Sequence, residues 1–395
     1  MLPCSDQSAR ADYAAPSRRA VEDKVLTEAA ILLHVTQKVL AADASVAPCL
    51  EQSHKRLLKT LAARAYPERY FDMLARAPHI AWPLGITHAI LSRHAVVNPS
   101  FEKLLERCID LGWNGFVDRS IYRTLETRWA LAVYKNHHPE VADLLALAPT
   151  NDTLPAPLAL RESVYALTHT LFYASDFGAY PMPDSVKLDR TAECIDSFLA
   201  WQMWEGDLDL VGELLAAAYM CRLPSKYASI AIAVLWDDFC RPVVRGPYAK
   251  ISHKGAVSPF DPTIFSSCYH TTFVCGILCA AILASGRPME SDRISNGEVR
   301  SLTRSEVQPL FDILEQSGRP TVTWFSRIAA VRDSRMTILS CLFDGAVTIA
   351  YRTGNWRSVY ALRNYREAMS IGATRTWRSI AELCNLWKDF GEDSS

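Results

Sequence analysis

The sequence predicts an all-α protein built from antiparallel helix pairs. Apolar residues recur at three- and four-residue spacing along most of the chain, which is the period of a half-buried helix. Strict two-residue alternation is scarce, and Pro or Gly marks the connections between the periodic segments. Helix pairs joined by short turns close into an α/α barrel (toroid) or stack as an open solenoid, and the sequence leaves both arrangements open.

The elements follow in order from the N-terminus. Residues 1–19 carry two prolines and no period, which predicts a disordered tail. A helix is expected over 21–40, where Val25, Leu26, Ala29 and Leu33 fall on one apolar side. Further helices are predicted at 46–65, 100–111, 119–136, 159–175, 189–204, 208–222, 225–239, 263–284, 304–317, 335–351, 355–369 and 375–389. One weak strand is predicted at 320–324.

Three prolines within 148–157 predict the main domain boundary. The chain then divides into an N-terminal helical subdomain, 20–150, and a C-terminal α/α domain, 158–390. With 395 residues, 49% of them hydrophobic, the chain is long enough for one large domain or two medium ones.

Composition disfavours several classes of protein. Lys and Arg number 42 against 43 acidic residues, so no global charge attracts nucleic acid or an anionic membrane. The longest apolar run, 273–284, is shorter than the ~20 residues of a membrane span. Eleven scattered cysteines and an N-terminus without a secretory signal indicate reduced thiols in a cytoplasmic protein. The sequence does not indicate an oligomeric state.

The best candidate site lies in the helix predicted at 159–175. Glu162, His169 and Asp176 follow one another at intervals of seven residues. Seven residues fall about 20° short of two full helical turns, so the three side chains lie on one helix face. Tyr165 and Tyr173 flank His169 at four-residue spacing. We interpret the row as a pocket wall in which His169 is a base or ligand and the carboxylates orient it. The alternative is a buried polar ladder that only joins helices.

Metal binding is a second hypothesis. His88, His169 and His270 each stand beside Thr in an apolar helical segment, and facing one cavity they would suit Zn or Fe. Glu162 and Asp176 are each about 10 Å from His169 along the helix axis, so all three cannot bind one ion. A lone His in an apolar helix is more often a core residue, and no tight ligand spacing strengthens the metal hypothesis.

Two charged segments supply further candidates. Glu213 follows a helix start near Asp207 and is the acidic residue there that we expect to face inward, as a substrate-binding group with Tyr165 and Tyr173. Six arginines alternate with aromatics between 351 and 378, a pattern that suits an anionic ligand or RNA. The same pattern is typical of a solvated helix face with its aromatics turned inward.

Three segments carry a resemblance to a known family: Thr168–Gly178, Asp209–Leu215 and Tyr269–Thr272. The first reads Thr-His-x-x-Phe-Tyr-x-Ser-Asp-Phe-Gly. These segments resemble an uncharacterised all-helical bacterial family whose members are often encoded beside natural-product genes. The resemblance transfers no activity. It implies a setting in specialised metabolism and favours His169, Asp176, Glu213 and His270 as one set.

The leading hypothesis is therefore an enzyme of natural-product metabolism. It would act on a small molecule or on a carrier-bound or peptide substrate in a helical cavity, through His169 with Asp176 or Glu162 and with possible assistance from a metal. The alternative is a non-catalytic helical-repeat protein that binds a peptide or protein partner.

Overall fold

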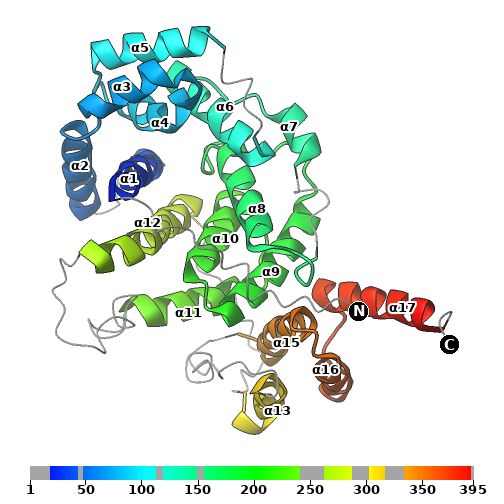
Figure 1. Ribbon diagram of the computed structural model, residues 1–395. Helices are drawn as coiled ribbons and strands as arrows, with labels where there is room; N and C mark the ends of the chain where they lie inside the picture. The colour runs from blue at the N-terminus through cyan, green and yellow to red at the C-terminus, as the bar shows by residue number, and fades with distance from the viewer. Residues whose placement is uncertain are drawn as a thin grey trace.

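The computed structural model describes residues 18–42, 48–112, 119–148, 155–240, 262–286, 302–315 and 333–392. Every regular element within these ranges is a helix, which confirms the all-α prediction (Figure 1). The tail up to residue 17, the strand at 320–324 and the centre of the predicted boundary at 149–154 lie outside the described residues.

The first part of the chain forms the helices before residue 150. They are α1 (Arg18–Ala42), α2 (Pro48–Ala62), α3 (Glu68–Arg76), the 3-10 turn η1 (Pro78–Ile80), α4 (Ala81–Ser92), α5 (Pro99–Asp110), α6 (Ile121–Lys135) and α7 (Ala142–Leu147).

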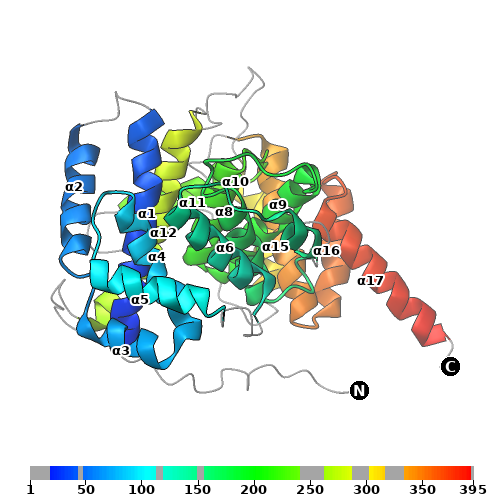
Figure 2. The same cartoon turned by 90° about the horizontal axis from the view of Figure 1, so that it is seen from above.

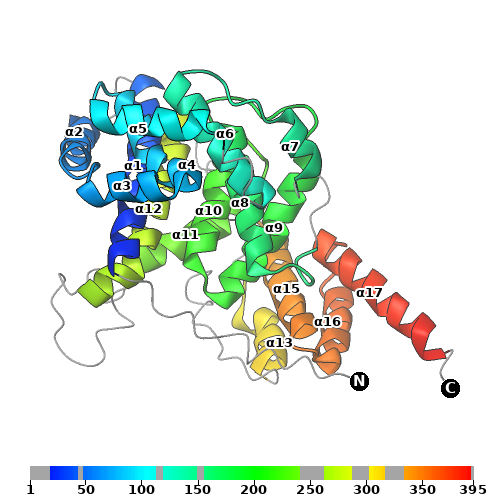
Figure 3. The same cartoon turned by 45° about the horizontal axis from the view of Figure 1, so that its top comes forward.

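The second part supplies the centre and the C-terminal end. Its helices are α8 (Arg161–Ala174), α9 (Leu188–Glu205), α10 (Leu208–Met220), α11 (Ala228–Cys240), α12 (Pro262–Ser285), α13 (Arg304–Glu315), α15 (Arg335–Arg352), α16 (Trp356–Ala368) and α17 (Arg375–Glu392). Figure 3 shows α13, α15, α16 and α17 gathered at one end of the molecule, next to α9.

Periodicity missed three helices, α3, α4 and α7. In α4 all side chains from Ala81 to Leu91 except Pro83 are buried, so no polar face gives the sequence a helical period. Helix α3 is confined between Pro67 and Pro78, and α7 spans only six residues. Segments this short or this uniformly apolar fall below what periodicity detects.

One buried core runs from Ala29 in α1 to Ile380 in α17, across the predicted boundary near residue 150. Figures 1 and 2 show α1 and α12 side by side, although more than 200 residues of sequence separate them. Helix α10 packs against the other side of α12. The N-terminal helix therefore shares its packing with helices of the predicted C-terminal domain.

A glycine sets the close approach of α10 and α12. A Cβ atom on Gly212 would lie 2.5 Å from Cγ1 of Val274, closer than side chains approach. The hydrogen of Gly212 therefore lets α12 lie against α10 directly beside Glu213. The carboxylate side chain of Asp207 caps the start of α10 by accepting from the amide of Leu210.

No helix within the described residues combines the length and the apolar character needed to cross a bilayer.

Candidate functional site

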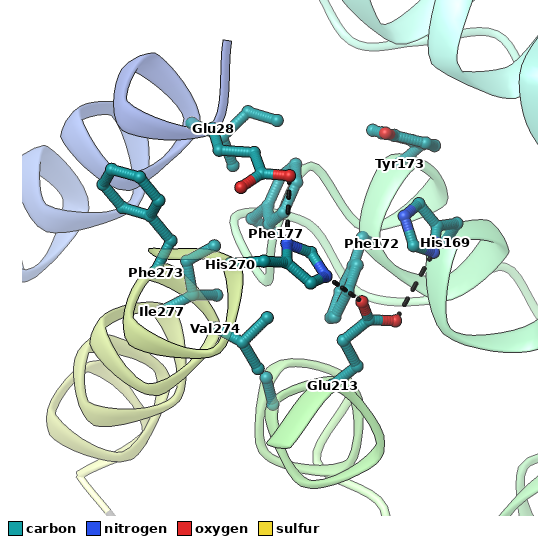
Figure 4. A pocket seen from close by; sticks show the side chains of 12 residues that line it. Glu28, His169, Phe172, Tyr173, Phe177, Glu213, His270, Phe273, Val274 and Ile277 are labelled. Carbon is teal, nitrogen blue, oxygen red and sulfur yellow. Dashed lines mark ion pairs between the residues drawn. The ribbon is translucent and has the colours of Figure 1, made fainter. Parts of the chain in front are cut away.

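A pocket lies where α1, α8, α10 and α12 meet (Figure 4). Its cavity volume is about 70 Å³. At ~10–15 Å³ for each water molecule, this space holds only a few heavy atoms. The lining residues are Glu28, Ile31, His169, Phe172, Tyr173, Phe177, Glu213, Ala216, His270, Phe273, Val274 and Ile277.

Glu213 is the central polar residue of the pocket. It is 3% exposed, and its two carboxylate oxygens face different histidines. Oε2 lies 3.6 Å from Nδ1 of His169, and Oε1 lies 3.5 Å from Nε2 of His270. The hydroxyl of Thr168 donates to Oε2 at 2.8 Å. Glu28 continues the row, since its Oε1 lies 2.9 Å from Nδ1 of His270. Figure 4 shows this chain of alternating carboxylates and imidazoles along the pocket.

The row holds two groups in their charged forms. Burial alone would raise the pKa of Glu213, but the neighbouring His169 and His270 and the Thr168 hydroxyl outweigh it, and the pKa falls below its ordinary value. Burial alone would lower the pKa of His270. Interaction with Glu213 and Glu28 outweighs this effect and raises the pKa to about 9. At neutral pH, Glu213 is therefore a carboxylate and His270 an imidazolium.

The neighbours of His169 fix which of its ring nitrogens carries hydrogen. Nδ1 lies 3.0 Å from the carbonyl oxygen of Tyr165, and this carbonyl and the Glu213 carboxylate only accept hydrogen bonds. The Thr168 hydroxyl donates its single hydrogen to Glu213 and therefore does not donate to Nδ1. Nδ1 therefore carries hydrogen. Figure 4 shows Nε2 on the side of the ring that faces the pocket, where the neutral imidazole has a lone pair.

Several polar atoms at the other end of the row lack a hydrogen bond of good geometry. They are Oε2 of Glu28 and both ring nitrogens of His270, all of them buried. The His270 nitrogens face carboxylates at ion-pair distance, but the angles are unsuited to hydrogen bonds. Oε2 of Glu28 is thus a buried acceptor beside the pocket.

Asp176 lies beside this pocket and does not line it. Its Oδ1 accepts at 2.7 Å from Nε2 of His34 and at 2.7 Å from Nε1 of Trp129. Nζ of Lys38 lies 3.0 Å from Oδ2 and also donates to the main-chain oxygen of Asp176. Burial alone would raise the pKa of Asp176, but the His34 hydrogen bond and the Lys38 charge lower it to about 2. Asp176 is a positioning residue that ties the turn after α8 to α1 and α6.

The tied turn has an unusual backbone. Asp176, Phe177 and Gly178 have φ values of 47°, 51° and 82°, all in the left-handed region. Such a conformation is unfavourable for residues with a Cβ atom and persists only where the surroundings hold it. A Cβ atom on Gly178 would lie 3.2 Å from the backbone of Met220, which explains the glycine. The turn places the ring of Phe177 in the pocket wall.

The remaining candidates on α8 have different positions. Glu162 is exposed and does not line the pocket. Tyr165 packs against His169, with ring centroids 5.3 Å apart, and Arg161 covers its other side at 4.8 Å. The ring of Tyr173 lines the pocket, but its hydroxyl donates to Glu126 at 2.8 Å. Burial raises the pKa of Tyr173 well above its ordinary value, so this hydroxyl stays protonated.

The structure does not bring His88 to the pocket. It is 1% exposed, its Nδ1 lies 2.9 Å from the hydroxyl of Tyr66, and it packs against Phe101 and Tyr134. Burial lowers the pKa of His88 and keeps it neutral. Of the three histidines predicted to bind a metal, only His169 and His270 meet, on either side of Glu213. Among the described residues, no three His, Cys, Asp or Glu side chains converge as a metal site.

Sequence reasoning missed the contribution of α1. Glu28 lines the pocket, and His34 and Lys38 hold Asp176, yet the segment around them was interpreted only as an apolar helix. A carboxylate among Leu26, Ala29 and Ile31 was the available signal, since ionisable groups on an apolar face are costly to bury. No periodic pattern pointed to Trp129.

The C-terminal arginines bind largely to the protein itself. Arg352 lies over Trp201 and donates to the carbonyl of Ala159, and Arg366 lies over Trp377. Arg363 pairs with a glutamate one turn away. Contacts of this kind are typical of helices packed on a core.

Searches among curated proteins and among solved structures gave no match to this chain. A family model described as a domain of unknown function, DUF6895, matches residues 4–280, which include every residue that lines the pocket. The match covers more than half of the chain, and the chain therefore belongs to the DUF6895 family.

Proposed function

We propose that this protein is an enzyme in which His169 acts as a general base on a small molecule or on the end of a larger substrate. One observation carries the proposal: the buried Glu213 carboxylate lies behind Nδ1 of His169, while Nε2 faces a pocket. A carboxylate behind an imidazole selects its tautomer and stabilises the imidazolium that forms when Nε2 takes a proton.

The lining of the pocket narrows the reaction class. Its described side chains include no Ser or Cys, the nucleophiles that a neighbouring histidine commonly activates, and no Thr or Lys. In the proposed reaction, His169 takes a proton from the substrate itself or from a water molecule that attacks it. The apolar walls would hold the substrate and exclude other water, which strengthens the pair of His169 and Glu213.

The small size of the pocket supports a substrate that inserts only one of its ends. A cavity of about 70 Å³ is small beside the ~300–1,000 Å³ of typical ligand pockets. A carrier-bound or peptide substrate would insert one group and leave its body outside. The motif resemblance adds natural-product metabolism as the setting, and the free thiols of the described cysteines support a cytoplasmic location.

Binding of a Zn or Fe ion is a separate prediction, which the proposed base does not require. The described donors do not form a three-ligand site, so no step is assigned to a metal. Elemental analysis of the purified full-length protein tests it, and a stoichiometric transition metal would support a metal-assisted reaction.

The test compares wild type with His169→Ala by mass spectrometry after incubation with metabolite extracts of bacteria that carry natural-product genes. We expect wild type to consume at least one compound that His169→Ala leaves unchanged, with both proteins folded. His79→Ala removes an exposed imidazole on η1 and serves as the matched control. Equal turnover by His169→Ala would contradict the proposal. A protein that turns nothing over but retains a peptide or protein partner would support the binding alternative.

A further inference from the structure

The pocket has an excess of negative charge. Glu28 and Glu213 each contribute a carboxylate to the lining, and His270 contributes one imidazolium between them. Lys24 lies 3.4 Å from Oε1 of Glu28, but its side chain is 55% exposed, so water screens its charge. Asp209, one turn before Glu213 on α10, also lies close enough to His270 for their charges to interact. The two carboxylates and the imidazolium of the lining together carry a net charge of about −1 in a largely apolar wall.

One carboxylate oxygen in this wall lacks a hydrogen-bond donor. Oε2 of Glu28 is buried and accepts no hydrogen bond from the described part of the chain. A buried carboxylate oxygen without a donor is costly, because burial removes its water without replacing it. A donor on a ligand in the pocket would remove that cost.

Four aromatic rings contribute to the wall, beside the aliphatic side chains of Ile31, Ala216, Val274 and Ile277. Rings of Phe172, Tyr173, Phe177 and Phe273 line the same cavity. The faces of aromatic rings attract cations, and aromatic cages with a nearby carboxylate are the usual receptors for alkylated ammonium groups. A cavity of about 70 Å³ suits such a head group and excludes a bulky one.

We infer that the group entering the pocket is an alkylammonium, held between the carboxylate of Glu28 and the aromatic rings. This inference rests on the proposed function, because it names the substrate class of the same pocket. The ammonium head would balance the excess carboxylate and donate to Oε2 of Glu28. The attached carbon chain would lie along the apolar wall toward the mouth, within reach of His169.

Binding of simple probes to the full chain at pH 7 tests the inference. Calorimetry would compare n-butylammonium and n-butyltrimethylammonium with neutral n-pentanol and anionic pentanoate. We expect n-butylammonium, whose N–H groups can donate to Oε2 of Glu28, to bind at least about tenfold more tightly than pentanol and pentanoate. Pentanol or pentanoate binding as tightly as the cations would overturn the inference, and so would stoichiometric binding of Zn²⁺ with no binding of either cation.

Two variants locate the binding. Glu28→Gln should weaken the binding of n-butylammonium by about tenfold or more. Glu382→Gln removes the same charge from an exposed position on α17 and should not weaken it. Phe273→Leu keeps the wall apolar and should weaken binding of the cation by more than it weakens binding of pentanol. This variant keeps the test decisive if Glu28→Gln does not fold. Equal affinities in wild type and Phe273→Leu for the cation would place the binding elsewhere.

The outcomes separate this inference from the proposed function. His169→Ala should retain cation binding, since its imidazole is not part of the cation site. If wild type binds cations but turns nothing over, the protein binds ammonium groups and the proposed enzyme activity is contradicted. If wild type turns over a substrate but binds no cation, the proposed base is supported and the ammonium substrate is contradicted.

Discussion

Oδ1 of Asp176 lies 2.7 Å from Nε2 of His34, which joins the turn after α8 to the N-terminal helix α1. The same helix carries Glu28 into the pocket, and the same turn carries Phe177. A carboxylate that sequence analysis placed among the catalytic groups therefore holds two walls of the pocket in register.

Replacing Asp176 with Asn should destabilise the protein markedly. The amide side chain lacks the charge that balances Lys38, whose side chain is 21% exposed, and breaking a largely buried pair costs on the order of 3 kcal/mol. Denaturant unfolding measures the loss. Asp143→Asn, which breaks an exposed pair with Arg128, is the control and should change the free energy of unfolding much less. Similar losses in the two variants would mean that the Asp176 cluster is not a structural tie.

Replacing Glu213 with Gln should change the protonation of His169. The carboxylate lies 3.6 Å from Nδ1 and, together with the Tyr165 carbonyl at 3.0 Å, favours hydrogen on this nitrogen. An amide can present a donor to Nδ1 instead, which weakens that preference and increases the share of the other tautomer. Ring nitrogen chemical shifts measured by NMR report the tautomer without a substrate. On any substrate found, turnover should fall by about 100-fold or more. An unchanged His169 tautomer with full turnover would separate Glu213 from the base.

Stability should fall between pH 6.5 and about 9 because of His270. Its pKa is raised to about 9 in the folded chain from an ordinary 6.5, so its contribution is complete below 6.5 and is lost as pH rises through 9. The loss is on the order of 3 kcal/mol. His270→Gln should remove this pH dependence. Unfolding free energies of the two proteins across this range test it, and parallel curves would contradict it.

Asp344 should produce a second pH dependence at lower pH. The carboxylate is buried, and among the described residues it accepts from the hydroxyls of Tyr227 at 2.9 Å and Thr374 at 2.5 Å. Burial raises its pKa from 3.8 to about 7, so the folded state takes up a proton that the unfolded state does not. Stability should therefore rise as pH falls from 7 toward 4. Asp344→Asn should flatten the curve there and leave the window above pH 7 intact.

Replacing Gly212 with Ala should destabilise the pair of α10 and α12. The added methyl group would lie 2.5 Å from Val274, and overpacking of this kind costs about 1–3 kcal/mol. Thermal unfolding measures it, with Gly372→Ala, which meets open space, as the control. The double variant Gly212→Ala with Val274→Ala should recover part of the loss. No recovery would show that Val274 is not the obstacle.

Sequence by itself determined the helical class and much of the chemistry of the pocket. Period and punctuation located most of the long helices, because a half-buried helix must alternate its faces every three or four residues. The residues of the first and second motif segments gave His169 and Glu213, and the third gave His270. All three line the pocket. Local patterns carry this information, since each helix records which of its faces meets water.

Only the tertiary structure decided which ionisable groups meet. Glu28 and His270 lie 242 positions apart in the chain, yet their side chains approach to 2.9 Å because α1 packs on α12. Asp176 and His169 share a helix period, but the left-handed turn directs the aspartate to His34. Helix periodicity fixes the direction of a side chain relative to its own axis. Partners on other helices depend on packing between segments, which no local pattern encodes.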